Sequence, residues 1–315
     1  MTTRQAGSIP TRPRVSAAAG AGVSNDLEVA ASVAALLRGY SVEVTARDRA
    51  AVEVCRDHLR PGTEVYIAFV PDETHHTVVE QATRLRRAGF VPVPHVTARN
   101  FGSFTQASDF LARLAGEAGV DRALVVAGDA DRAAGPYASS LELLRTGLFQ
   151  AHGLRRVGLA VYPEPHRKIG SKALDEALVA KLDLAREAGL EAWLVSQFCF
   201  EATPILRRAD ALRSQGVDAP LRVGLAGPAD RRSLWKYALH CGIGSSIRAL
   251  GTRVDAVANL LSRRAPDGIV AEIVAARRRN PALGIGGVHI FTFGGVAAAA
   301  SWANAALAAA HPPRR

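Results

Sequence analysis

The stretch from Arg155 to Arg167, RRVGLAVYPEPHR, guides the interpretation of the whole chain. Val157 to Val161 is a short apolar run, typical of a strand that is buried on both faces. A Pro-Glu-Pro turn at Pro163 to Pro165 ends the run, and a helical pattern then covers Ser171 to Ala188 and stops at Gly189. The unit is strand, polar turn and helix. Its polar groups lie at the carboxyl end of the strand, where parallel α/β folds bind ligands.

The same unit repeats along the chain. A leader over residues 1–24 is expected to be flexible, and Asn25 or Asp26 caps a first helix over Leu27–Arg38. Strands are predicted at Ser41–Ala46, Glu64–Val70, Phe90–Val96, Arg122–Ala127, Val157–Val161, Glu191–Gln197, Pro220–Ala226 and Gly287–Phe293. One helix is predicted to follow the first strand and end at Leu59, and another to begin at Pro228. The other predicted helices are Thr74–Ala88, Ser103–Ala118, Tyr137–Ala151, Ser171–Ala188, Thr203–Gln215, Ile247–Arg263, Gly268–Arg279 and Val296–Ala310.

This alternation predicts an α/β protein with a single (β/α)8 TIM barrel over residues 25–315, with extra helices before the last strand. No segment between the units has the composition of a linker, so one domain is expected. A doubly wound open sheet is the alternative. The first strand is not followed by G-x-G-x-x-G, which counts against a dinucleotide-binding sheet.

Composition narrows the class of protein. The chain of 315 residues is 48% hydrophobic and 22% charged, which is typical of a globular protein. Its formal charge of +10 is dispersed and aromatic residues make up only 6%, so we expect small anionic ligands and no nucleic acid. The isolated cysteines Cys55, Cys199 and Cys241 suit a reducing compartment. His75 and His76 are expected to start a helix, and no metal site is predicted.

Targeting signals are not apparent in the sequence. No run of 18 consecutive apolar residues is present, and the basic amino end lacks the apolar region of a secretory signal. We therefore expect a cytoplasmic protein without a membrane partner. Whether it forms a homo-oligomer stays open.

Polar groups gather at the predicted carboxyl ends of the strands. Glu43 lies between two valines, and it points into the barrel if they point outward, where a buried carboxylate needs a partner. Four of the polar residues at the strand ends have a structural role as the alternative. Glu43 could form a buried ion pair, Asp129 could cap a loop, Gln197 could be a hydrogen-bonded core amide, and His166 could lie on the surface. The full set is Glu43, His95, Thr97, Asp129, Tyr162, Glu164, His166 and Gln197. Gly242 to Ser246 is interpreted as a helix stop followed by a serine cap, with phosphate binding as the alternative.

Taken together, these stretches resemble methylenetetrahydrofolate reductase, a flavin-dependent barrel enzyme. The similarity runs in order from about residue 40 to residue 310. It rests on seven short motifs: Ser41-Val42-Glu43, Pro94-His95-Val96-Thr97, Gly128-Asp129, Tyr137-Ala138-Ser139, Tyr162-Pro163-Glu164 with His166, Ser196-Gln197-Phe198-Cys199-Phe200, and His289-Ile290-Phe291-Thr292.

The resemblance implies an oxidoreductase of one-carbon metabolism and methionine biosynthesis. In this family, FAD reduced by NADH or NADPH gives hydride to 5,10-methylenetetrahydrofolate, producing 5-methyltetrahydrofolate. Glu43 matches the general acid, and its apolar neighbours suggest a protonated carboxyl near neutral pH. Asp129 matches the group that stabilises the cationic iminium, Gln197 the amide that orients folate, and Tyr237 the aromatic residue against the benzoyl ring. Positions similar to the family's flavin contacts are His95, Gly128, Asp129, Tyr137, Ala138, Tyr162, His166, Asp175 and Lys181.

Several positions depart from the family pattern. Ala127 replaces an arginine before Gly-Asp, Leu184 and Ala185 replace a basic pair that contacts flavin phosphate, and Gly295 replaces another arginine. The end of the second strand, Phe69-Val70-Pro71, lacks the family's hydroxyl. These replacements favour weak binding or loss of FAD. A flavin-free barrel, or one that binds folate without catalysis, is the alternative.

Overall fold

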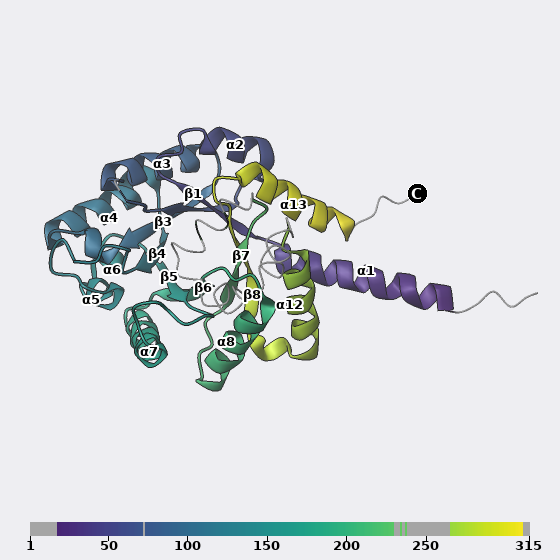
Figure 1. The fold of residues 1–315 in the computed structure, drawn as a ribbon. Coiled ribbons are helices and arrows are strands. Elements are labelled where there is room, and N and C mark those ends of the chain that lie inside the picture. The colour runs from purple at the N-terminus through teal and green to yellow at the C-terminus, as the bar shows by residue number, and fades with distance from the viewer. Residues whose placement is uncertain (1–17, 72, 230–233, 235–236, 238–264, 311–315) are drawn as a thin grey trace, which may run out of the picture.

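The computed structural model describes residues 18–71, 73–229, 234, 237 and 265–310. The predicted helix Ile247–Arg263, the glycine stretch Gly242–Ser246 and Cys241 lie outside the described residues, as does most of the helix expected from Pro228. The described strands form a closed parallel barrel in the order β1 to β8, and β1 pairs with β8 (Figure 1). The predicted (β/α)8 fold is therefore confirmed.

The strands lie close to their predicted positions. Their bounds are β1 (Ser41–Thr45), β2 (Glu64–Ala68), β3 (Val91–Thr97), β4 (Arg122–Val126), β5 (Arg156–Val161), β6 (Glu191–Ser196), β7 (Leu221–Ala226) and β8 (Ile285–Phe291). All the neighbouring pairs are parallel, so the carboxyl ends of all eight strands meet at one mouth of the barrel.

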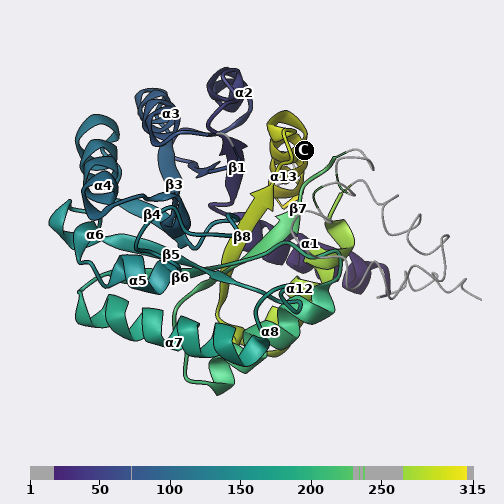
Figure 2. The ribbon, with the colours of Figure 1, turned by 60° about the vertical axis from the view of Figure 1, so that its left-hand side comes forward.

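Helices surround the barrel on its outer side (Figure 2). Among the described residues they are α1 (Ala18–Leu37), α2 (Ala51–His58), α3 (His75–Arg87), η1 (Ala98–Asn100), α4 (Phe104–Ala118), α5 (Ser140–Leu144), α6 (Leu148–Ala151), α7 (Ser171–Glu187), α8 (Ala202–Ser214), α12 (Asp267–Arg279), η2 (Pro281–Leu283) and α13 (Val296–Ala309). The extra helix predicted at Gly268–Arg279 is thus present as α12. None of the described helices is both long enough and apolar enough to cross a membrane.

Two helix predictions were wrong in their bounds. Helix α1 begins at Ala18, so residues 18–24, expected in the flexible leader, are helical, and neither Asn25 nor Asp26 caps the helix. The single helix expected over Tyr137–Ala151 is divided into α5 and α6, because Gly147 adopts a left-handed φ of 72° that interrupts the helix.

Strand β5 shows how the sequence fills both sides of the sheet. Val157, Leu159 and Val161 are at most 1% exposed and belong to the main core between barrel and helices. Gly158 faces the barrel interior, where a Cβ atom would lie 2.7 Å from Cζ2 of Trp193. The glycine therefore makes room for the indole ring. A smaller interior cluster comprises Tyr66, Val93, Leu124, Val195, Val126 and Trp193.

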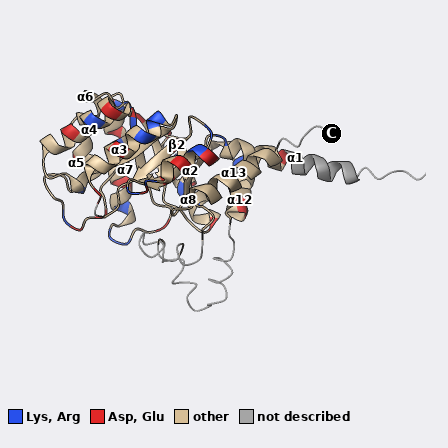
Figure 3. Cartoon of the chain, turned by 90° about the horizontal axis from the view of Figure 1, so that it is seen from above, with Lys and Arg blue, Asp and Glu red and all other residues tan. Residues whose placement is uncertain are grey.

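Charged residues are distributed over the helices. Figure 3 shows Lys and Arg interspersed with Asp and Glu on the helices around the barrel. This pattern agrees with the dispersed charge seen in the sequence and does not form one basic face in that view.

Candidate functional site

The side chains of Glu43, His95 and His289 meet inside the barrel. Nε2 of His95 lies 3.3 Å from Oε2 of Glu43, and Nε2 of His289 lies 3.8 Å from the same oxygen. The side chains of Glu43 and His95 are 21% and 15% exposed, whereas that of His289 is 1% exposed. Glu43 and His95 are therefore open to a ligand, and His289 lies behind them.

Strand register explains this meeting. Val42 and Val44 pack in the outer core, so Glu43 between them points into the barrel, as predicted. On the other side of β1, Ser41 is opposite His289 of β8, and the Ser41 hydroxyl lies 2.9 Å from Nδ1 of His289.

The ionisation of Glu43 differs from the sequence expectation. Burial raises the pKa of its carboxyl, but the imidazoles of His289 and His95 beside it outweigh this and lower the pKa to about 2. The carboxyl is thus ionised near neutral pH, not protonated as expected from Val42 and Val44. Burial lowers the pKa of His289, which favours a neutral ring. The expectation failed because the imidazoles nearest to Glu43 in space come from strands that are far from it in the sequence.

Aromatic rings lie beneath and beside the cluster. The ring of Tyr66 lies 4.2 Å from that of His289 and 6.3 Å from that of His95, measured between centroids. Its hydroxyl accepts a hydrogen bond of 3.0 Å from Nε1 of Trp193. Burial raises the pKa of the Tyr66 phenol, so this group stays neutral.

The loop after β4 carries Asp129 and is tied to the segment after β3. Arg99 donates from its backbone N–H to the carbonyl of Ala127 (2.9 Å) and from its guanidinium to the carbonyls of Ala130 (3.1 Å) and Ala138 (2.8 Å). Gly128 has a φ of 91°, and a Cβ atom there would lie 2.9 Å from Oδ1 of Asn100. Glycine is therefore required where the loop leaves the barrel.

Thr97, at the end of β3, packs beneath this loop. It is 3% exposed, its Cβ would lie 3.2 Å from a Cβ added at Gly128, and its hydroxyl has no hydrogen-bond partner among the described residues. Farther along the loop, Tyr137 is 6% exposed and Ser139 caps α5 in a capping box with Glu142. Ala138 contributes its carbonyl to Arg99.

The loop after β5 lies beside the Asp129 loop. The rings of Tyr162 and His166 meet edge to face at 4.8 Å, and Asp129 lies close enough to His166 to interact with it electrostatically. Burial lowers the pKa of His166. An ion pair between Lys168 and Asp131 also joins the two loops. Glu164 of the same loop lies near Cys199, which is buried at the end of β6.

An aromatic group surrounds the ends of β6 and β8. Phe198 contacts Phe291 at 5.2 Å and Phe293 at 5.1 Å, and Tyr237 stacks on Phe293 at 4.8 Å. Phe293 has a φ of 51°, a strained value for a bulky residue that orients its ring toward this group. Next to Phe198, the side-chain oxygen of Gln197 accepts the N–H of residue 198 at 3.0 Å, so its amide nitrogen is the group available to a ligand.

Asp175 and Lys181 lie on α7 and are not part of the central cluster. Asp175 pairs with Arg208 of α8 at 2.6 Å. Burial lowers the pKa of Lys181, and no ion-pair partner of this lysine is present among the described residues. Leu184 packs against the core and Ala185 is 1% exposed, so the positions of the missing basic pair face the protein interior.

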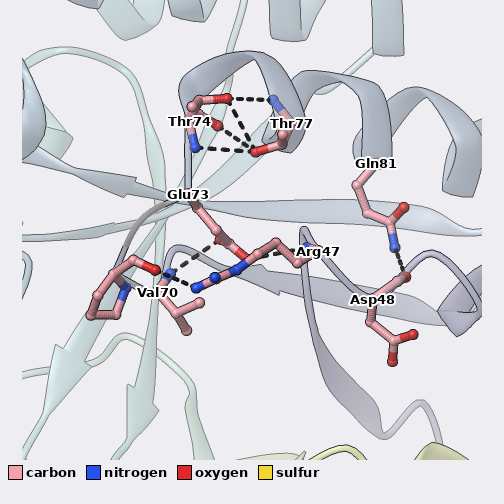
Figure 4. Close-up of polar contacts among 8 residues, drawn as sticks. Arg47, Asp48, Val70, Glu73, Thr74, Thr77 and Gln81 are labelled. Atoms are coloured by element: carbon pink, nitrogen blue, oxygen red, sulfur yellow. Dashed lines mark hydrogen bonds and ion pairs between the residues drawn. The ribbon is translucent and has the colours of Figure 1, made fainter.

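A buried carboxylate holds the loops after β1 and β2 together (Figure 4). The side chain of Glu73 is fully buried and accepts the backbone N–H groups of Arg47 and Val70, each at 3.1 Å. The Arg47 guanidinium lies 3.8 Å from Glu73 and also donates to the carbonyl of Pro71. Burial raises the pKa of the Glu73 carboxyl. This contact fixes the loop immediately beyond β1, which carries Glu43.

Sequence analysis missed the contributions of His289, Ser41, Tyr66 and Arg99. His289 and Ser41 occur in the quoted motifs but were given no role. Ser41 could have been found because it lies on the same face of β1 as Glu43. His289 lies opposite Ser41 on β8, and recognising this requires the register of β8 against β1. Among the described residues, no group of three or more His, Cys, Asp or Glu side chains is arranged to hold a metal ion.

The arrangement can transfer a proton and stabilise a positive charge. Glu43 and His95 form an accessible carboxylate–imidazole pair, which suits general acid–base chemistry. Asp129 supplies a carboxylate at a neighbouring strand end, and the aromatic group offers faces for a planar ring. Fold and site together define a (β/α)8 barrel protein with a carboxylate–imidazole cluster at the carboxyl ends of its strands.

Comparison with known proteins supports the fold. No protein-family model matches the chain. The chain is similar to an uncharacterized protein from Clostridium thermocellum that binds two copies of 5-methyl-5,6,7,8-tetrahydrofolic acid, with a TM-score of 0.51, 12% identity, and coverage of 86% of this chain and 93% of that chain. It also matches 3-dehydroquinate dehydratase from Geobacillus kaustophilus HTA426, with a TM-score of 0.44, 11% identity, and coverage of 88% and 93%.

Proposed function

We propose that this barrel reduces 5,10-methylenetetrahydrofolate to 5-methyltetrahydrofolate, with FAD as cofactor and NADH or NADPH as reductant. The observation that carries the proposal is the Glu43–His95 pair, partly exposed at the barrel mouth and backed by His289. Folate as the ligand class is supported by the barrel from Clostridium thermocellum, which shares the fold and binds a methylated tetrahydrofolate.

The Glu43–His95 pair provides the proton for ring opening. The bond between the methylene carbon and one folate nitrogen breaks, that nitrogen takes up a proton, and the carbon remains as an iminium cation. Because Glu43 is ionised near neutral pH, we assign the proton-donating role to the His95 nitrogen that faces its carboxylate at 3.3 Å. The pair acts as the general acid, in place of a protonated Glu43 alone.

Asp129 and Gln197 would bind and stabilise the substrate. The Asp129 carboxylate favours the cationic iminium over its neutral precursor, because opposite charges attract more strongly away from bulk water. The free amide nitrogen of Gln197 can donate to a folate carbonyl. Tyr237 and Phe293 present stacked rings against which the benzoyl group can pack.

The residues present fit a flavin in part. Tyr162 and His166 lie in the loop after β5 with rings that suit a planar heteroaromatic group, whereas Tyr137 is buried in the main core. Lys181 is desolvated, lacks an ion-pair partner among the described residues, and would hold a phosphate. A bound reduced flavin would supply the hydride that converts the iminium carbon to a methyl group.

The test is an absorbance spectrum of the purified protein, recorded anaerobically before and after NADH or NADPH. We expect a flavin band at roughly 450 nm that the reductant bleaches and that 5,10-methylenetetrahydrofolate restores. A yellow protein that NAD(P)H reduces but methylenetetrahydrofolate cannot reoxidise would contradict the proposed reaction.

A flavin-free or non-catalytic folate-binding barrel is the second candidate. The burial of Ala185 and the packing of Leu184 against the core favour it, since these positions cannot present charge to a flavin phosphate. A colourless protein that added FAD does not colour, but that binds 5-methyltetrahydrofolate in calorimetry, would support this candidate. Turnover of methylenetetrahydrofolate with NAD(P)H would then distinguish a flavin-free reductase from a non-catalytic binder.

A further inference from the structure

The buried ring of His289 connects a hydroxyl to the candidate catalytic carboxylate. Oγ of Ser41 lies 2.9 Å from Nδ1 of His289, and Nε2 of the same ring lies 3.8 Å from Oε2 of Glu43. Ser41 is fully buried and His289 is 1% exposed, so neither can contact a substrate. Both residues can affect the chemistry only through Glu43.

The β1–β8 pairing fixes the three residues relative to one another. Ser41 and Glu43 are two positions apart on β1 and share its inner face, and Ser41 is directly opposite His289 on β8. Thr292, just beyond β8, donates from its hydroxyl to the backbone carbonyl of Glu43 at 2.6 Å. The backbone of Glu43 is therefore held by the same strand that carries the histidine.

The neighbours of the ring determine which nitrogen carries the proton. A neutral imidazole has one N–H donor and one acceptor nitrogen, and the Glu43 carboxylate can only accept. The proton therefore belongs on Nε2, facing Glu43, which leaves Nδ1 to accept the hydroxyl of Ser41. The other titratable groups around His289 are Tyr66, His95 and Arg222, and burial keeps the ring neutral.

We propose that Ser41 and His289 are positioning residues for Glu43. Ser41 holds His289 in the Nε2–H tautomer, and this N–H orients the Glu43 carboxylate beside His95. The separation of 3.8 Å between Nε2 and Oε2 is longer than a hydrogen bond, so the attraction that orients the carboxylate is electrostatic. The alternative tautomer would point a nitrogen lone pair at the carboxylate.

The tautomer is measured by ¹⁵N NMR of the ring nitrogens in the labelled full-length protein, with the His289 signals assigned from the His289→Gln variant. We expect a protonated Nε2 and an unprotonated, hydrogen-bonded Nδ1. Ser41→Ala should change the Nδ1 signal and give a mixture of tautomers. Ser196→Ala is the control: Ser196 is a buried hydroxyl on β6 bonded only to backbone groups, and its loss should leave the His289 signals unchanged. A protonated Nδ1 in the unmodified protein, or unchanged signals in Ser41→Ala, would overturn the proposal.

The kinetic consequence rests on the proposed function. Ser41→Ala and His289→Leu should lower kcat for folate reduction about 10- to 100-fold with little change in KM, because a misdirected carboxylate affects proton transfer more than binding. His289→Gln keeps an N–H near the Nε2 position and should restore most of the loss. Equal rates for His289→Gln and His289→Leu would contradict the positioning role. If the unmodified protein reduces no folate, the proposed function fails, and the NMR result alone decides the tautomer.

Discussion

At the scale of single residues, the charge on Glu43 depends on two histidines. Burial alone raises the pKa of the carboxyl, but its contacts with His95 and His289 stabilise the anion and lower the pKa to about 2. Glu43 therefore acts with His95, and removing the negative charge of Glu43 should weaken proton donation by His95 while leaving the surrounding packing in place.

Glu43→Gln tests this pair, because the amide has nearly the same volume but no negative charge. We expect the folding transition and folate binding to persist and turnover to fall by about 100- to 10,000-fold. Stopped-flow measurement of the folate half-reaction, with calorimetry of folate binding as the control, checks this. Full turnover in the variant would remove Glu43 from the mechanism.

The same carboxyl makes stability depend on pH. Its pKa is about 2 in the folded protein against 4.5 as a reference, so the unfolded chain takes up the proton first as the pH falls. The resulting stabilisation, about 3 kcal/mol, is present above pH 4.5 and is lost as the pH falls toward 2. The difference in unfolding free energy between the unmodified protein and Glu43→Gln should therefore shrink over this interval in urea titrations. A constant difference would show that Glu43 does not gain its stability from ionisation.

At the scale of elements, periodicity predicted most strands and helices, and turn chemistry accounts for the exceptions. The apolar run Val157–Val161 gave β5 correctly because both of its faces are buried. The helix over Tyr137–Ala151 was predicted as one piece because the side-chain pattern does not show that Gly147 adopts a left-handed φ of 72°. The pairing of Glu43 with His95 and His289 was beyond the sequence pattern, since it depends on strand register and barrel closure.

Arg99 links two such elements and should control the placement of Asp129. Its guanidinium bonds the carbonyls of Ala130 and Ala138, both within the loop that carries Asp129, in a fork that a lysine cannot reproduce. Arg99→Lys should lower kcat/KM for folate reduction by about tenfold or more, because a small displacement of Asp129 weakens its action on the iminium.

Arg86→Lys is the matched control for Arg99→Lys. Arg86 makes a similar fork to the carbonyls of Ala118 and Gly119, at 3.1 and 2.7 Å, at the end of α4 that leads into β4 and away from the barrel mouth. Both variants should lose about 1 kcal/mol of stability in urea unfolding, but only Arg99→Lys should change the kinetics. Equal kinetic losses would show that the effect of Arg99 is general destabilisation.

At the scale of the whole molecule, the two ends of the barrel have different roles. The site at the carboxyl ends contains a carboxylate between imidazoles, whereas the interior at the amino ends contains Glu64 of β2 between Arg122 of β4 and Arg222 of β7. Arg122 lies 2.6 Å from Glu64 and also pairs with Asp121 at 2.9 Å. These contacts join strands that are not neighbours in the barrel, so they support its closed form and are not placed to contact a ligand at the mouth.

Glu64→Gln should therefore destabilise the barrel without altering its chemistry. The side chains of Glu64, Arg122 and Arg222 are 14%, 16% and 27% exposed, so removing the carboxylate leaves two poorly solvated guanidinium groups facing each other. Breaking a buried pair in this way costs about 3 kcal/mol, because Arg222 loses its carboxylate partner in a poorly solvated position, whereas Arg122 keeps Asp121. Urea unfolding measures the loss, and Glu117→Gln, which breaks an exposed pair with Arg113 on α4, should cost much less than Glu64→Gln. Equal costs for the two substitutions would mean that water reaches the amino end of the barrel, and the ion pairs of Glu64 would then not account for its closure.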